Sequence, residues 1–139
     1  NSYQNYEPLI KQDGFYKAIY LQYSGRFTES EVLYKELWES NCHMTVYGEL
    51  FLSLYMDKLK DYSKAYKLVN DLILVNDYWL PYKKIYVELA VKNGDFVFAR
   101  ETMKEIVDRG MIESEDYELF YNEYQRLEAE ALEEFENDW

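Results

Sequence analysis

A motif that recurs every 34 to 35 residues constrains the fold of this 139-residue chain more than any other feature. Three stretches, Gly25–Ser30, Lys60–Ala65 and Gly94–Ala99, align in one register, each with an aromatic third residue and a small sixth residue. Further apolar columns keep the same offsets of 35 and then 34 residues: Leu37, Leu72 and Ile106, and Tyr20, Tyr55 and Leu89. A fixed period of this length indicates a repeat protein in which each copy is one supersecondary unit.

Each copy has the apolar spacing of two amphipathic helices, as in Ala65, Leu68, Val69 and Leu72. We predict helix pairs over residues 12–24 with 28–40, 46–58 with 62–76, and 81–93 with 96–109. The predicted start and stop signals are a capping box over Thr28–Glu31, an N-cap at Asp95, Pro81 in a first turn, and Gly110 as a C-terminal stop.

A last helix is predicted over residues 115–136, with Ser114 as its cap. Its apolar stripe consists of Phe120, Tyr124, Leu127, Ala131 and Phe135. The formal net charge of −12 is concentrated here, because residues 111–139 hold eleven acidic residues and one basic residue, Arg126. The rest of the chain is nearly neutral, so the acidic end does not by itself exclude a nucleic-acid partner for the repeats.

These patterns predict an all-α fold, an α-solenoid of about three helix–turn–helix repeats of 34–35 residues followed by an acidic C-terminal helix. The expected boundaries are 1–11 for a leader or the end of a preceding repeat, 12–45, 46–80 and 81–110 for the repeats, and 111–139 for the acidic capping helix or tail. No apolar run approaches the roughly 20 residues of a membrane span.

A helix–turn–helix unit of this length, with Gly-Asp or Gly-Arg at the turn and Ala five residues later, resembles the pentatricopeptide repeat. The third unit matches best, through Tyr86–Leu89, Lys92–Asp95, Ala99, Met103, Ile106 and Gly110. The tetratricopeptide repeat, at 34 residues, is the competing family. The resemblance covers residues 12–110.

The resemblance to the pentatricopeptide family implies a mitochondrial or other organellar protein that binds single-stranded RNA or belongs to a ribonucleoprotein such as the mitochondrial ribosome. RNA-reading members place small polar residues early in the first helix and at the end of each unit. The corresponding residues here are Tyr16, Phe51 and Ile85, and Val46, Pro81 and Glu115. Five of these six cannot supply the usual base-edge contacts, so a scaffold within a ribonucleoprotein is favoured over a base reader.

Lysines are the candidate contacts to RNA phosphates or to a partner. Lys60, Lys64 and Lys67 are expected on one helix face, with Lys58 nearby, and Lys83, Lys84 and Lys92 form a second group. A solvated helix face is the alternative interpretation of both groups. The candidate acidic docking surface comprises Glu128, Glu130, Glu133 and Glu134.

No sequence motif of a known catalytic, nucleotide or metal site is present, so we expect no enzyme activity and no cofactor. Cys42 and His43 are adjacent in a predicted loop and do not form a nucleophile–base pair. The alternative function is a tetratricopeptide-like adaptor that binds a peptide or helix, with no RNA role. An accessory helical region of an enzyme is a third, weaker option.

Overall fold

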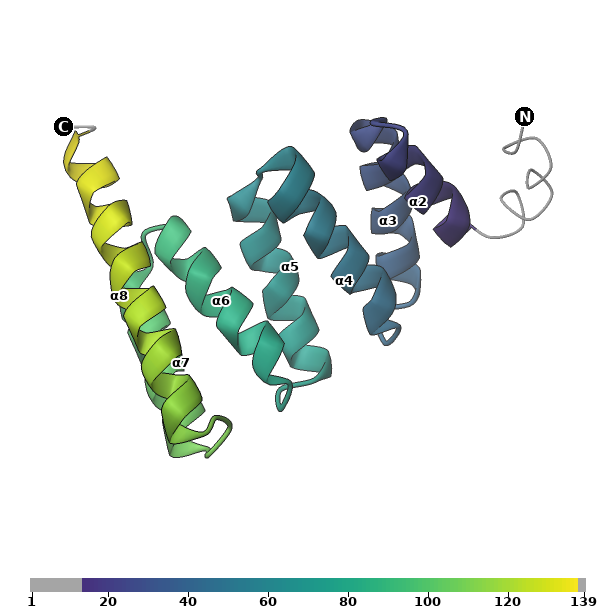
Figure 1. Cartoon of the computed structure of the whole chain (residues 1–139). Coiled ribbons are helices and arrows are strands. Elements are labelled where there is room, and N and C mark those ends of the chain that lie inside the picture. Colours follow the sequence, from purple (N-terminus) through teal and green to yellow (C-terminus); the bar gives the residue numbers. More distant parts are fainter. Residues whose placement is uncertain (1–13, 138–139) are drawn as a thin grey trace. The chain divides into compact units, whose positions relative to one another are not determined.

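The computed structural model describes residues 14–137, and this part of the chain is all-α, with no strand (Figure 1). The predicted leader, residues 1–11, lies outside the described residues. The chain divides into two compact units, Asn1–Asp61 and Tyr62–Trp139. Since this division falls inside the second predicted repeat, its two helices belong to different units, and each unit is described by itself.

The first unit contains α2 (Gly14–Tyr23), α3 (Phe27–Ser40), α4 (Thr45–Ser53) and the π-helix η1 (Leu54–Leu59). Consecutive helices pack on one another: α2 on α3, α3 on α4, and η1 on α3. At the first of these contacts Ser30 and Ala18 are fully buried, and the Ser30 hydroxyl donates to the Ala18 carbonyl at 2.8 Å. A small side chain is needed here because the two helix backbones approach closely.

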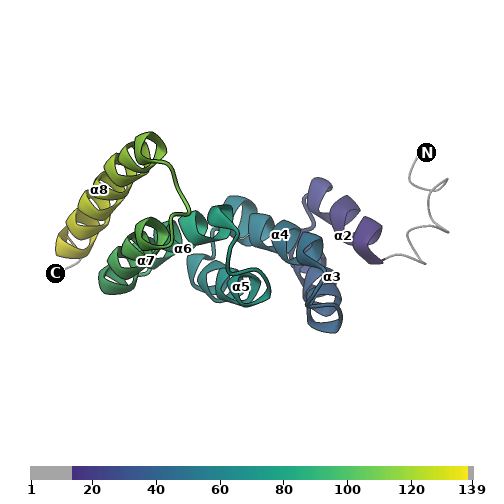
Figure 2. The ribbon, with the colours of Figure 1, turned by 90° about the horizontal axis from the view of Figure 1, so that it is seen from below.

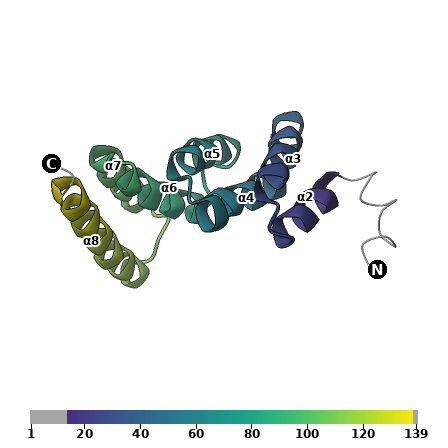
Figure 3. The same cartoon turned by 90° about the horizontal axis from the view of Figure 1, so that it is seen from above.

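The second unit contains α5 (Tyr62–Val75), α6 (Leu80–Lys92), α7 (Phe96–Asp108) and α8 (Ser114–Asn137). Helix α6 packs between α5 and α7, and α8 packs mainly on α6 rather than on α7. Figures 2 and 3 show α8 standing apart from α7, to which a loop joins it. The core of this unit includes Val87, Ala99, Ile106, Tyr124 and Ala131.

The small-residue column of the predicted repeat is confirmed in the packing, whereas the apolar columns are not uniformly buried, since Tyr20 is 36% exposed and Leu37 is half-buried. Ser30, Ala65 and Ala99, the small residues of the three copies, are all completely buried. The first residue of each aligned stretch has a positive φ: 77° at Gly25, 53° at Lys60 and 80° at Gly94. All three copies therefore turn between their helices through the same left-handed conformation, which glycine adopts without strain and lysine does not.

The same type of turn ends α7, where Gly110 has φ 63°. At three of these four turns the amide after the glycine donates to a carbonyl five residues earlier: Arg26 to Leu21, Asp95 to Ala90 and Met111 to Ile106. These are the hydrogen bonds of Schellman-type helix ends. At the remaining turn, Asp61 donates to Tyr55, six residues earlier, because the preceding helix is wound as a π-helix.

Several local predictions are wrong. The capping box is absent, because α3 begins at Phe27, Arg26 is its N-cap without a side-chain bond, and the Glu31 carboxylate accepts from the Tyr55 hydroxyl at 2.8 Å. Asp95 is the N-cap residue of α7, as predicted, but its side chain makes no capping bond. Ser114 is the first residue of α8 and not its cap. The predicted continuous helix over 46–58 changes from α to π geometry at Leu54.

Most of the apolar stripe predicted on α8 is confirmed. Tyr124 and Ala131 are buried, and Phe120 and Leu127 pack against the core of the second unit. Phe135 is 42% exposed, although its ring meets Phe96 edge-on. None of the helices in the described part combines the length and apolar character needed to cross a membrane.

Candidate functional site

The lysines predicted to lie on one helix face are separated by the turn between the two units. Lys58 is in the last turn of η1, and Lys60 follows it as the left-handed residue that ends this helix. Lys64 and Lys67 belong to α5, which begins only at Tyr62. The prediction that Lys60 shares a helix face with Lys64 and Lys67 is therefore wrong, because the chain leaves the helical conformation between them. Lys58, Lys60, Lys64 and Lys67 are all exposed.

Lys83 has a structural environment that the sequence pattern did not predict. Its side chain is only 7% exposed, and its ammonium group donates to both Glu105 oxygens, at 3.1 and 2.8 Å, and lies 2.9 Å from an Asp77 oxygen. Both carboxylates come from outside α6, so Lys83 joins the loop before α6 to helix α7. An ammonium group enclosed in this way is not available to an RNA phosphate, so Lys83 is removed from the candidate contacts.

Arg109 completes this cluster of charges. It lies 2.9 Å from the second Asp77 oxygen and over the ring of Tyr78, with 4.5 Å between guanidinium carbon and ring centroid. The hydrogen bond from Lys83, together with Arg109, holds the pKa of Asp77 below its usual range. Burial alone would lower the pKa of Lys83, but its bonds to Glu105 and Asp77 outweigh this effect and raise it. Asp77 and Lys83 therefore both remain charged at neutral pH.

The other two lysines of this group lie over aromatic rings of the second unit. The ammonium group of Lys84 is 5.4 Å from the centroid of Phe120, and that of Lys92 is 4.5 Å from the centroid of Tyr62. These are distances at which a cation is attracted to the ring face. Lys92 is exposed, whereas Lys84 is half-buried between α6 and α8.

The acidic docking surface is only partly open. Glu128 is 14% exposed and forms an ion pair with Arg100, and Glu130 lies 2.7 Å from Arg126. Glu133 and Glu134 are exposed and form no ion pair within residues 14–137. Two of the four acidic residues are therefore exposed and outside any ion pair of the described residues, while Glu128 belongs to the contact between α7 and α8.

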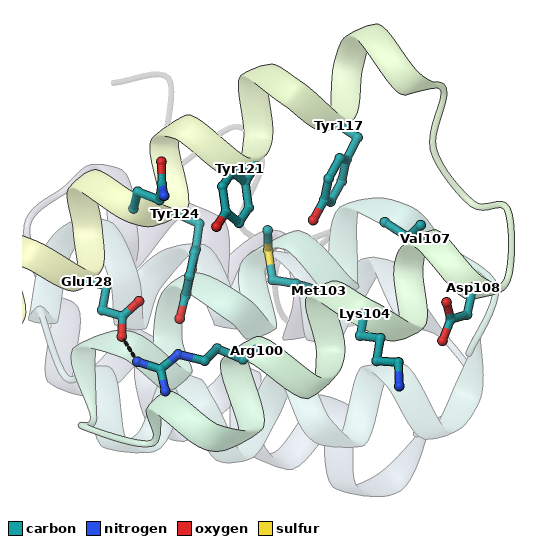
Figure 4. A pocket seen from close by; sticks show the side chains of 10 residues that line it. Arg100, Met103, Lys104, Val107, Asp108, Tyr117, Tyr121, Tyr124 and Glu128 are labelled. Atoms are coloured by element: carbon teal, nitrogen blue, oxygen red, sulfur yellow. Dashed lines mark hydrogen bonds and ion pairs between the residues drawn. The ribbon is translucent and has the colours of Figure 1, made fainter.

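A groove of about 350 Å³ lies between α7 and α8, where these helices diverge. Tyr117, Tyr121 and Tyr124 project from α8 toward α7 along it (Figure 4). Their rings follow one another with centroid separations of 5.9 and 6.4 Å. Helix α7 contributes Arg100, Met103, Lys104, Val107 and Asp108, and α8 also contributes Gln125 and Glu128.

The charged side chains along the groove differ in whether they are paired. At one end, Arg100 pairs with Glu128, and the nearby Tyr124 hydroxyl is buried and makes no hydrogen bond. Burial raises the pKa of Tyr124 to about 12, so this hydroxyl stays neutral. Along the rest of the groove, Lys104 and Asp108 are exposed and form no ion pair within the described residues.

Of the three tyrosines, only Tyr124 was predicted to belong to the apolar stripe of α8. The spacing of four and then three residues between them is nevertheless typical of residues that share one helix face.

The residues at the positions that correspond to RNA-reading residues differ in their exposure to solvent. Phe51 is buried against Tyr34 and Tyr55, whereas Tyr16 is 49% exposed on α2. Pro81 lies in the first turn of α6.

Cys42 is exposed in the loop before α4. Residues 14–137 contain no cluster of three or more His, Cys, Asp or Glu side chains that could hold a metal ion.

Comparisons of the chain with protein-family models, with curated proteins and with solved structures give no match.

Proposed function

We propose that this chain is a non-enzymatic helical-repeat binding module, similar to pentatricopeptide proteins, that acts as a scaffold in a ribonucleoprotein of mitochondrial gene expression. The repeated left-handed turns and buried small residues support a repeat array. Burial of Phe51 is the observation that favours a scaffold over a base reader, because a side chain packed in the core cannot read a base edge. The mitochondrial location rests on the family resemblance.

The RNA contact in this proposal is to the phosphate backbone. We assign it to Lys58 and Lys60 of the first unit and to Lys67 of the second unit, which are exposed; the other exposed candidates are Lys64, and Lys92 over the Tyr62 ring. A few phosphate contacts give weak binding with no base preference, and the affinity falls with rising salt. The acidic helix α8 repels phosphates, so any RNA would contact the chain away from that helix.

The test is binding of fluorescent single-stranded homopolymer RNAs to the whole chain over a salt series. We expect similar weak affinities for all homopolymers, with a log–log slope of about −0.7 for each phosphate contacted. Charge reversal of Lys58, Lys60 and Lys67 should abolish the binding. A matched control reverses Lys17, Lys35 and Lys104, which are also exposed and change the net charge by the same amount.

Each possible result leads to a definite conclusion. A preference of more than about 10-fold for one homopolymer would contradict the scaffold interpretation, because phosphate contacts carry no base information. Equal losses in both triple variants would show that net charge, and not this group of lysines, determines binding. Absence of binding at low salt would remove RNA contact from this part of the protein.

The tetratricopeptide-like adaptor is retained as a second candidate because of the tyrosines on α2. Tyr16 and Tyr23, on the first helix of the first unit, are 49% and 87% exposed. A peptide or helix lying on this helix would cover both rings, and buried aromatic residues commonly dominate binding energy at interfaces. No RNA binding at low salt, together with loss of a protein partner in Tyr16→Ser and Tyr23→Ser, would favour the adaptor.

A further inference from the structure

The groove between α7 and α8 contains aromatic rings that no cation of the chain covers. Elsewhere in the second unit, Lys84, Lys92 and Arg109 lie over Phe120, Tyr62 and Tyr78 respectively. Tyr117 and Tyr121 also line an open surface, but no lysine or arginine of the described residues lies over either ring. Their faces are therefore available to a cation from outside the chain.

The charges around the groove also favour a cation. Residues 111–139 carry eleven acids against Arg126 alone, so the potential over α8 is strongly negative. Within the groove, Arg100 and Glu128 neutralise each other as an ion pair. Asp108 forms no ion pair in the described part of the chain and is exposed, so a carboxylate is left for an incoming charge.

The groove already shows how a guanidinium group is accommodated. At one end, Arg100 forms an ion pair with Glu128 beside the Tyr124 side chain (Figure 4). Tyr117, Tyr121 and Asp108 lie along the remainder, where aromatic rings are again combined with a carboxylate. A volume of about 350 Å³ is enough for a few side chains, whereas an α-helix is about 10 Å wide with its side chains.

We propose that this groove binds a basic, extended segment of a partner protein, with a lysine or arginine side chain against Tyr117 and Tyr121 and its charge paired with Asp108. The inference rests on the proposed scaffold function and specifies the chemistry of one protein partner. RNA does not fit the site, because its phosphates would meet the acidic helix. An apolar helix does not fit either, because it would leave Asp108 without a partner.

Lys104 provides an internal check of this assignment. It lines the same groove, four residues before Asp108 on α7, and is exposed. A cationic ligand is repelled by it, so Lys104→Ala should strengthen binding, whereas Asp108→Asn should weaken it. An anionic ligand would produce the opposite changes.

The experiment measures fluorescence anisotropy of a short labelled peptide, with arginine at every third position between glycine and serine, added to the whole chain. A peptide with glutamine in place of arginine is the uncharged control. We expect the arginine peptide to bind with micromolar affinity and the glutamine peptide not to bind. The affinity for the arginine peptide should fall about 10-fold in the double variant Tyr117→Leu, Tyr121→Leu. Tyr117→Phe, which keeps the ring, should bind almost as wild type does, and circular dichroism should show unchanged helicity in each variant.

The matched control for Asp108→Asn is Glu133→Gln, which removes one exposed carboxylate that does not line the groove. Equal effects of these two variants would mean that the peptide responds only to net charge, and would overturn the groove assignment. Binding of the glutamine peptide, or an unchanged affinity in the Tyr117 and Tyr121 double variant, would also overturn it. Failure of peptide binding together with intact, salt-dependent RNA binding would refute this inference and leave the proposed scaffold function in place. Intact peptide binding without any RNA binding would refute the RNA contact of the proposed function and leave the groove assignment in place.

Discussion

Replacing Lys60 with glycine should stabilise the first unit, because Lys60 has φ 53° in a turn where the other two copies have glycine. A left-handed conformation costs a residue with a Cβ atom about 1–2 kcal/mol. Glycine removes this strain but gains about 0.4–1 kcal/mol of conformational freedom in the unfolded chain. The net expectation for Lys60→Gly is a gain of about 0.5–1 kcal/mol in the free energy of unfolding.

The assay is urea unfolding monitored by circular dichroism at a fixed pH and salt concentration. Lys60→Ala is the matched control, since it removes the same charge and long side chain but keeps the Cβ atom, and should leave stability nearly unchanged. Gly25→Ala is the reciprocal variant: a Cβ there meets nothing within 4 Å, so its loss of about 0.5–1 kcal/mol would come from the backbone alone. At Gly94 the loss should be larger, because the new Cβ would lie 3.2 Å from the Phe135 ring.

The reasoning fails if Lys60→Gly lowers the urea midpoint, or if Lys60→Ala stabilises the chain as much as glycine does. The first result would mean that the freedom of glycine in the unfolded chain exceeds the strain of the turn. The second would mean that the charge or side chain of Lys60, and not its backbone, is the unfavourable element.

Three further perturbations test the packing. Lys83→Met should lower the free energy of unfolding by about 1–2 kcal/mol in a urea titration, because the two carboxylates lose their shared cation while remaining partly hydrated; an unchanged midpoint would show that the cluster adds nothing. Ser30→Ala should cost about 1 kcal/mol by the same measurement, because the buried bond to Ala18 is lost; full stability would mean that burial alone accounts for the small residue. The lowered pKa of Asp77 means that its ion pairs stabilise the fold above the unfolded pKa of about 3.9, and that this contribution is lost as the pH falls through the folded value. The stability difference between wild type and Asp77→Asn should therefore be present at neutral pH and shrink below about pH 4, and a difference that does not depend on pH would contradict the assignment.

Much of the helical framework could be predicted from the sequence because it depends on local spacing. The observed α5, α6 and α7 begin and end within one residue of the predicted ranges. Alignment of the repeats placed a turn at Gly25, Lys60 and Gly94, although not the left-handed backbone angle that all three residues adopt. Periodicity also gave most of the face that α8 presents to the core.

The electrostatic details could not be predicted in the same way, because they depend on partners far apart in the chain. Lys83 is buried through Glu105, which lies 22 residues away, and Glu128 is covered through Arg100, 28 residues away. The capping box over Thr28–Glu31 matched its motif, but α3 begins at Phe27, and the Glu31 carboxylate accepts from the Tyr55 hydroxyl, 24 residues away. Predictions from local sequence treat charged residues such as Lys and Glu as exposed to solvent, because the partner that buries them lies far away in the chain.

The groove between α7 and α8 shows the same limit. The spacing of Tyr117, Tyr121 and Tyr124 places them on one helix face, but whether that face is buried or open depends on how α8 meets its neighbours. Helix α8 packs mainly on α6, which leaves the tyrosines over a groove along α7 instead of a closed contact. A prediction made one helix at a time does not show on which neighbouring helix α8 packs.

The left-handed turn also bears on how the repeats of this chain can be recognised. A residue other than glycine at this turn costs about 1 kcal/mol, which is a tolerable fraction of the 5–15 kcal/mol that stabilises an ordinary domain. Lys60 has the positive φ of Gly25 and Gly94 without being glycine. A search for the turn glycine alone would therefore miss the middle copy, whereas a comparison of backbone angles finds all three copies.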